Sequence, residues 1–204
     1  MVFPFLTVFL IFLLWLALRY AKIARIREED MESFWERERR ANSTRAKDIT
    51  SLDYLTIPLD KFPLNFSDDE DVKAIENELL ELSTHRLLNL TGMNNTDIKS
   101  AFGTPNFETM CQIGEDFDRV LVLLNDYAAK LMEADRFSDA ITVLTFAVEA
   151  GTDVTDSYIR LVDCYGKEGL EGKTEFIKML VQNSNLLTKN KILEHIERQP
   201  NEQQ

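Results

Sequence analysis

The first eighteen residues constrain the fold of this chain more than any other segment. Val2 to Leu18 contains no charged side chain, and Thr7 is its one hydroxyl-bearing residue. Four basic residues follow directly, namely Arg19, Lys22, Arg25 and Arg27. An apolar run of this length forms a helix of about 26 Å, close to the ~30 Å hydrocarbon core of a bilayer. The pattern predicts a transmembrane anchor over residues 1–23 that contacts the lipid bilayer through residues 2–20.

The charges beside this span predict its orientation. The basic residues all follow the apolar run and none precedes it. Basic flanks of a membrane helix stay in the cytoplasm. We therefore expect a single-pass protein of the cell membrane, with the N-terminus outside and the C-terminal domain cytoplasmic. A cleaved signal peptide is the alternative, but it needs a positive n-region and a small-residue cleavage site, and the sequence around Ala17 offers neither.

Charge is unevenly distributed over the rest of the chain. The formal net charge is −12, yet Arg19 to Lys47 carries nine basic and six acidic residues, a net +3. From Asp48 onward the net charge is −15. An acidic domain disfavours nucleic-acid binding, which requires a positive surface. It favours a basic or apolar protein or peptide as the partner.

Two segments of different composition follow the anchor. Residues 24–41 mix opposite charges at helical spacing and predict a juxtamembrane helix, either a solvated stalk or the seam of a homodimer. Within residues 42–67, eight large apolar side chains lie from Leu52 to Phe66, while Pro58 and Pro63 exclude a regular helix. We predict an extended strap, or linker, whose side chains pack on the helical domain. A free motif that binds a partner is the alternative.

Residues 68–198 are predicted to form an all-α domain. Apolar residues recur there at helical spacing, and glycine or short polar segments interrupt the pattern. The expected helices are 68–82, 96–102, a helix opening at Thr104-Pro105, 115–134, 137–150, 153–167, 173–182 and 188–197. Residues 199–204 are expected to form a disordered tail.

Residues 121–154 resemble one tetratricopeptide repeat. That family uses a helix–turn–helix of about 34 residues with small side chains where the two helices cross. Ala128 and Ala140 match these small positions. The large positions and the start of the second helix are matched by Leu124, Leu131 and Phe137. In the turn, Asp135 stands where the family usually has glycine.

Residues 155–188 resemble a second, degenerate repeat. Its first helix is matched by Tyr158, Val162 and Tyr165, while its second helix departs from the pattern. The resemblance implies a TPR-like helical bundle or short solenoid. The chain also resembles a group of single-pass membrane proteins of clostridia-like bacteria, through the segment from Leu52 to Pro63, the Leu90-Thr91-Gly92 break and the repeat pair. This second resemblance implies no activity.

A repeat in this phase directs six side chains of its first helices into the groove where the family binds peptides. They are Asn125, Ala129, Met132, Asp156, Ile159 and Asp163. The acidic members predict a basic or apolar ligand. We expect a membrane-anchored cytoplasmic adaptor or scaffold that binds a protein or peptide. The alternative is a structural subunit of a membrane protein complex, with the groove filled by the chain's own strap at residues 52–66.

The sequence predicts no catalytic, cofactor or metal site. His85 and His195 are isolated along the sequence, and no serine or cysteine has an evident base. Cys111 and Cys164 are far apart and have no neighbouring metal ligands. The glycines at 166, 169 and 172 do not have the spacing of a phosphate-binding loop. We therefore expect a protein that is not an enzyme and uses no cofactor.

Overall fold

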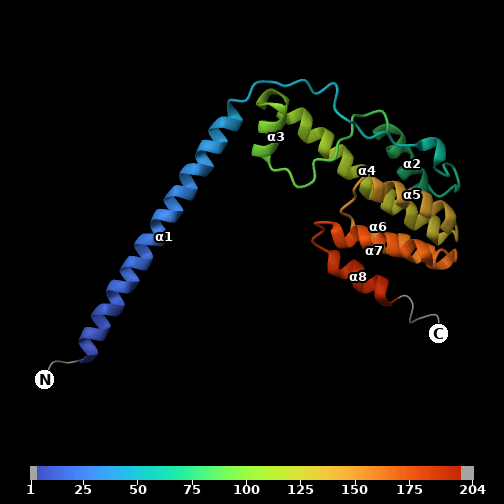
Figure 1. Cartoon of the computed structure of the whole chain (residues 1–204). Helices are drawn as coiled ribbons and strands as arrows, with labels where there is room; N and C mark the ends of the chain where they lie inside the picture. The colour runs from blue at the N-terminus through green and yellow to red at the C-terminus, as the bar shows by residue number, and fades with distance from the viewer. Residues whose placement is uncertain (1–3, 199–204) are drawn as a thin grey trace. The chain divides into compact units, whose positions relative to one another are not determined.

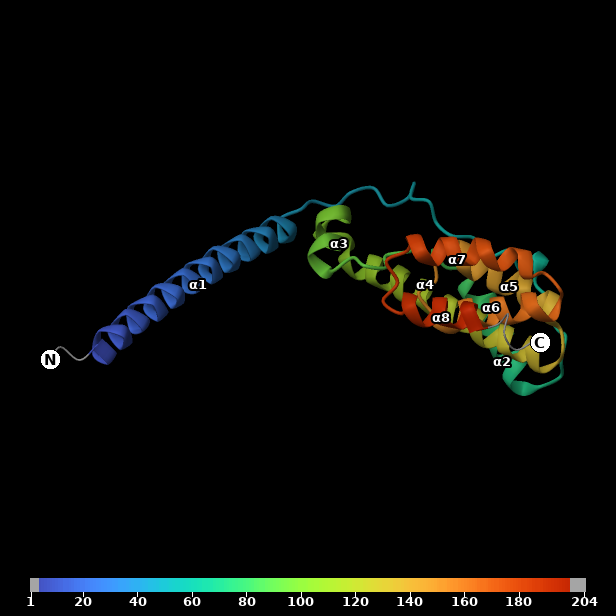
Figure 2. The same cartoon turned by 60° about the horizontal axis from the view of Figure 1, so that its bottom comes forward.

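The computed structural model describes residues 4–198, and within that range every regular element is a helix (Figures 1 and 2). The all-α class expected from the sequence is confirmed. The α-helices are α1 (Pro4–Asn42), α2 (Glu70–Leu82), α3 (Asn95–Phe102), α4 (Phe107–Glu133), α5 (Phe137–Glu149), α6 (Thr155–Lys167), α7 (Thr174–Asn183) and α8 (Lys189–Arg198). Short 3-10 turns occupy Leu59–Lys61, Thr104–Asn106 and Glu171–Lys173. The expected tail, 199–204, and the first three residues of the expected anchor lie outside the described residues.

The chain forms two compact units. We call Met1–Thr50 with Gly92–Met110 the first unit, and Ser51–Thr91 with Cys111–Gln204 the second unit. Each unit is described by itself below. The boundary passes through α4, whose residues from Cys111 onward belong to the second unit.

α1 is one unbroken helix of 39 residues that contains both the expected anchor and the expected juxtamembrane helix. Within residues 4–198 it is the one helix long and apolar enough to cross a membrane. No residue of its most apolar stretch is buried in the structure. At the end of that stretch the Arg19 guanidinium lies 5.3 Å from the centroid of the Trp15 ring. An aromatic and a basic side chain at this position suit the interface between lipid and water.

In the first unit, the end of α1 packs on α3. Ala41 is buried at 1% exposure, and its carbonyl oxygen accepts a hydrogen bond from the Thr104 hydroxyl at 2.9 Å. The segment after α1 continues this attachment, because the Lys47 amide donates to the Phe102 carbonyl at 3.1 Å. The residues after α1 are therefore bonded to the end of α3.

Gly103 follows α3 at a point where two segments of the backbone approach each other closely. Its φ is +92°, and a Cβ at this position would collide with the backbone of Arg45 and Ala46. At the other end of α3, Asn94 and Asp97 form a capping box in which each side chain accepts a bond from the other's backbone amide. Local signals thus define both ends of this short helix.

The second unit has a continuous hydrophobic core. α5 packs on α6, α6 packs on α7 and α8, and α7 packs on α8, as Figures 1 and 2 show from two directions. The expected crossing residues Ala128 and Ala140 are both completely buried. The core around them includes Leu121, Leu124, Leu131, Val143, Leu144, Leu161, Val162, Val181 and Ile192.

Three successive helices, α4, α5 and α6, end in the same left-handed turn. The second residue after the last helical one has a φ of +56° at Asp135, +85° at Gly151 and +66° at Gly169. The next amide then donates to the carbonyl five residues earlier, as in a Schellman motif. These bonds are Arg136 to Leu131 at 2.8 Å, Thr152 to Ala147 at 3.0 Å and Leu170 to Tyr165 at 2.8 Å. Asp135 occupies the turn because Asp tolerates the left-handed region better than most residues do.

α4 differs from the expectation of two helices. It runs without a break from Phe107 to Glu133 and so joins the helix expected to open at Thr104-Pro105 with the helix expected over 115–134. Ile113 is buried at 5% exposure, and Gly114 lies against the side chain of Leu90. Close packing at Gly114 makes this glycine compatible with the helix despite its low helix propensity.

Candidate partner-binding site

The six side chains predicted to contact a partner come from two helices of the second unit. Asn125, Ala129 and Met132 lie on α4, and Asp156, Ile159 and Asp163 lie on α6. Within each helix the spacings of three, four and seven residues place the set on one face. Asp156 is exposed, Asn125 is buried, and the other four are half-buried.

Asn125 connects the two helices. Its side-chain oxygen accepts a bond from the Ser157 hydroxyl at 3.4 Å, and its carbonyl oxygen accepts one from Arg160 Nη1 at 2.9 Å. Ser157 is completely buried, and Asn125 is 7% exposed. These bonds attach α4 to α6. The Asn125 side chain is therefore an internal group in this structure, not part of a ligand-facing surface.

The two acidic positions on α6 face a lysine and a histidine of α8. Asp163 Oδ1 lies 2.7 Å from His195 Nε2, and Asp156 Oδ1 lies 3.9 Å from Lys191 Nζ. Asp163 and His195 each expose about a third of their side chains, whereas Asp156 and Lys191 each expose more than half. An acidic face of α6 therefore contacts an edge of α8 that carries a lysine and a histidine.

Both histidines, although isolated along the sequence, thus have carboxylate partners in the fold. His85 Nδ1 lies 2.8 Å from Asp116 Oδ2. The partners are separated by 31 residues for His85 and by 32 for His195. For His195 that separation is near one repeat length, which is a signal that sequence reasoning had at hand and did not use.

The strap segment packs on the second unit. Ile57 and Phe62 are 5% and 6% exposed. The Phe62 ring lies edge-on to Phe146 of α5 with the centroids 5.7 Å apart, and the Leu55 amide donates to the Leu87 carbonyl at 2.8 Å. The side chains of the strap therefore contribute to the core of the second unit.

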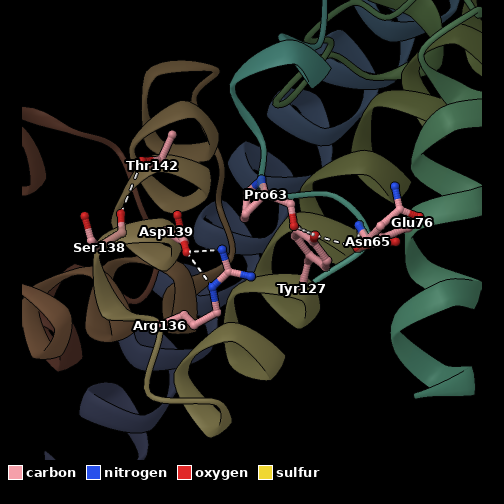
Figure 3. A network of polar contacts seen from close by, with 8 residues as sticks. All are labelled: Pro63, Asn65, Glu76, Tyr127, Arg136, Ser138, Asp139 and Thr142. Atoms are coloured by element: carbon pink, nitrogen blue, oxygen red, sulfur yellow. Dashed lines mark hydrogen bonds and ion pairs between the residues drawn. The ribbon is translucent and has the colours of Figure 1, made fainter. Parts of the chain in front are cut away.

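A buried polar network secures the end of the strap (Figure 3). Glu76 of α2 is 4% exposed, and its Oε1 accepts a bond from the Asn65 amide at 2.9 Å. The Tyr127 hydroxyl of α4 lies 2.7 Å from the same oxygen and 2.9 Å from the Pro63 carbonyl oxygen. Burial, and secondly the hydrogen bond to Glu76, raises the pKa of Tyr127. The network joins α2, α4 and the strap without a surface-exposed member among its side chains.

The strap does not cover the predicted partner positions through these interactions. Its hydrogen bonds and ring contacts described above go to Glu76, Leu87, Tyr127 and Phe146, none of which belongs to the six. Sequence reasoning proposed the strap but did not find Glu76 or Tyr127. A glutamate among the apolar residues of an amphipathic helix was the available signal, because such a group requires a partner when buried.

Other reactive groups form no cluster in the part of the chain that the structure describes. No group of three metal-ligating side chains occurs within residues 4–198. Burial raises the pKa of the Cys164 thiol to about 12, so little nucleophilic thiolate forms at neutral pH.

The first unit contains an open cavity of about 740 Å³ between α1 and α3. Two arginines, Arg37 and Arg40, share its lining with two carboxylates, Glu38 and Asp97. Glu38 accepts a hydrogen bond from the Thr96 hydroxyl across the cavity. The opposite charges balance one another, so the lining selects neither an anion nor a cation.

Comparison with protein-family models, with curated proteins and with solved structures finds no match to this chain. The function is therefore argued from the geometry alone.

Proposed function

We propose that this chain is a membrane-anchored adaptor that binds a basic helix or peptide. α1 would cross the cell membrane with its N-terminus outside, as the basic residues after the span favour. The second unit would lie in the cytoplasm as a TPR-like solenoid. Its partner surface would include the exposed parts of the five predicted positions other than Asn125, which is buried between α4 and α6.

The main support for this proposal is the pair of contacts that the carboxylates of α6 make with side chains of α8. Asp156 lies near the Lys191 ammonium and Asp163 lies within hydrogen-bond distance of the His195 imidazole, both on a separate helix. The face is therefore complementary in charge to a basic helix, and it buries apolar groups beside the charges, since Ile192 is completely buried. A binding surface for basic amphipathic helices needs both properties.

The repeat resemblance supports the same proposal. The positions at which tetratricopeptide repeats need small side chains, Ala128 and Ala140, are fully buried here. From α5 to α8, each helix also packs on the next helix in the chain. Membership of the tetratricopeptide class, and kinship with the clostridial single-pass proteins, are part of what we propose.

Co-purification after gentle detergent extraction tests the adaptor. Wild type is expected to retain a protein partner that the double variant Asp156→Lys, Asp163→Lys loses. The matched control is Glu171→Lys, Glu175→Lys, because these exposed acids lie outside the α6 face. Equal retention by all three chains would refute the proposed surface. Labelling of a C-terminal tag from outside intact cells would refute the orientation.

A second candidate is a structural subunit of a membrane complex without an exchangeable ligand. It is favoured by the strap, whose Ile57 and Phe62 are already buried by the chain itself. A high-salt wash separates the two candidates, because salt screens charge-based contacts. An adaptor would release its basic partner, whereas a subunit held by apolar contacts would stay in its complex.

A further inference from the structure

α8 is attached to the second unit by few groups. It has ten residues, of which two, Ile192 and Ile196, are buried, at 0% and 5% exposure. By contrast, α5 has five buried residues and α6 has six.

The attachment of α8 follows a regular pattern. Lys191 and His195 are four residues apart, and each directly precedes one of the buried isoleucines. This spacing places a lysine–isoleucine pair and a histidine–isoleucine pair along one edge of the helix. Lys191 and His195 reach Asp156 and Asp163, and the isoleucines enter the core of the second unit.

Neither ion pair holds α8 firmly. The Lys191–Asp156 pair spans 3.9 Å, with both side chains more than half exposed. Exposed pairs of this kind contribute little to stability. The His195–Asp163 pair is shorter but is still about one-third exposed on each side. Helices with small buried surfaces are the ones that open locally while the rest of a domain stays folded.

From this geometry we infer that α8 is a built-in occupant of the partner site, and that a basic amphipathic helix of the partner displaces it. The inference rests on the proposed function. The incoming helix would carry two branched apolar residues four positions apart, each beside a cation. The α6 carboxylates select cations and repel phosphate groups, so a protein helix fits this surface and a nucleic acid or an anionic lipid does not.

A peptide supplied in trans tests the inference on the full chain in detergent. The probe is a fluorescent synthetic peptide with the sequence of residues 186–198. In the variant Lys191→Glu, His195→Glu, like charges repel α8 from α6. This variant is expected to bind the peptide at least tenfold more tightly than wild type, whose site is occupied. Equal binding by the two chains, or no binding by a variant with intact helical circular dichroism, would overturn the inference.

Charge reversal on α6 supplies the specificity control. Adding Asp156→Lys and Asp163→Lys to that variant restores attraction to its own α8 and repels the basic peptide. Trans binding is therefore expected to disappear. A second control, Glu194→Gln with Arg198→Gln, removes an exposed ion pair within α8 and is expected to behave as wild type. Peptide binding by the α6-reversed chain would overturn the charge-selective site.

Hydrogen exchange of wild type gives an answer that needs no destabilised variant. Amides of α8 are expected to exchange at least tenfold faster than those of α6 when the unit is otherwise folded. Exchange of both helices at one common rate would show that α8 does not open separately and would overturn displacement.

A disulfide lock tests whether opening is required. The Thr155 and Thr188 hydroxyl oxygens, one beside each helix start, are 2.5 Å apart. In a Cys111→Ser background, Thr155→Cys with Thr188→Cys should form a bond that slows α8 exchange and weakens basic-peptide binding at least tenfold, with recovery on reduction. Unchanged peptide binding by the oxidised chain would contradict displacement. The adaptor proposal fails separately, if no membrane partner depends on Asp156 and Asp163.

Discussion

α1 and the helices of the second unit are both rich in large apolar residues, and they use them in opposite ways. Leu10 and Leu14 in α1 are 55% and 62% exposed, whereas Leu124 and Leu131 in α4 are completely buried. The first half of α1 is apolar around its whole circumference, but α4 is apolar on the side that meets other helices. The comparison shows that the period of the apolar residues, more than their number, separates a lipid-facing helix from a core helix.

Charged substitutions in the apolar half of α1 should have the largest effect, which is loss of membrane attachment. Without that effect, α1 would not differ from the helices of the second unit in the way described above. In Leu10→Arg, Leu14→Arg, each arginine costs about 2.5–3.5 kcal/mol at the centre of a membrane helix. The variant should leave the membrane pellet during an alkaline carbonate wash. The control Leu80→Arg, Val122→Arg charges exposed apolar sites of the second unit and should remain in the pellet. Retention of both chains would show that residues 7–18 do not hold the protein in lipid.

A cavity in the core should produce the next largest effect. Leu124→Ala removes a fully buried side chain and should lower the free energy of unfolding by about 2–5 kcal/mol. Leu14→Ala should leave the unfolding of the second unit unchanged, since Leu14 lies on α1. Urea titration in detergent, followed by tyrosine fluorescence, measures both. Similar losses from both substitutions would erase the distinction between the two regions.

Removing the Tyr127 hydroxyl tests the difference between α1 and the second unit at a buried polar group. Tyr127→Phe deprives Glu76 and the Pro63 carbonyl of a donor and should cost about 1–3 kcal/mol. Tyr20→Phe, at an exposed residue of α1, is the control and should cost nothing measurable.

The same hydroxyl predicts a pH dependence, because the Tyr127 pKa is raised in the folded state. Stability from this group is therefore present below the ordinary tyrosine pKa of about 10 and declines above it, where the unfolded chain ionises first. The gap between wild type and Tyr127→Phe should narrow at alkaline pH.

A surface ion pair should produce the smallest effect. Arg119 Nε and Nη2 lie 2.5 Å and 2.7 Å from the two oxygens of Glu78, and this contact holds the pKa of Glu78 below its ordinary value. Both side chains are more than one-third exposed, so Glu78→Gln should cost about 0.2–0.5 kcal/mol. The cost is present at neutral pH and vanishes as the pH falls through the lowered pKa, where wild type also becomes protonated. Urea titrations at pH 7 and pH 3, with the exposed Glu81→Gln as control, measure it.

Helices with a one-sided apolar pattern could be placed from the sequence almost residue by residue. The expected 137–150, 173–182 and 188–197 agree with α5, α7 and α8 within one residue at each end. Each has a local stop signal, such as Gly151 after α5. The union of two expected helices into α4 could not be predicted, because Gly114 is stabilised by packing against Leu90, which is 24 residues earlier in the chain.

The candidate site was harder to predict than the fold. The sequence placed Asp156 and Asp163 on one face of a helix through their spacing, and that placement follows from α6 itself. It could not show that Lys191 and His195 neutralise them, because a contact between separate helices depends on how those helices pack. The hydrogen bond between Glu76 and Tyr127 could not be predicted for the same reason, since its partners are 51 residues apart. Whether the six positions receive a partner stays a prediction.

The continuity of α1 has a mechanical consequence. A helix without a break from Pro4 to Asn42 is a rigid shaft about 58 Å long. In the proposed anchor, a twist or piston movement of the N-terminal half of α1 would reach Asn42 with little loss, because no loop interrupts the helix. Inserting two residues into the charged half would turn the part beyond the insertion by about 200° around the helix axis, whereas seven inserted residues would nearly preserve its phase. The length and phase of α1 therefore fix how far Asn42 lies from the N-terminal half of the helix and how it is rotated relative to that half.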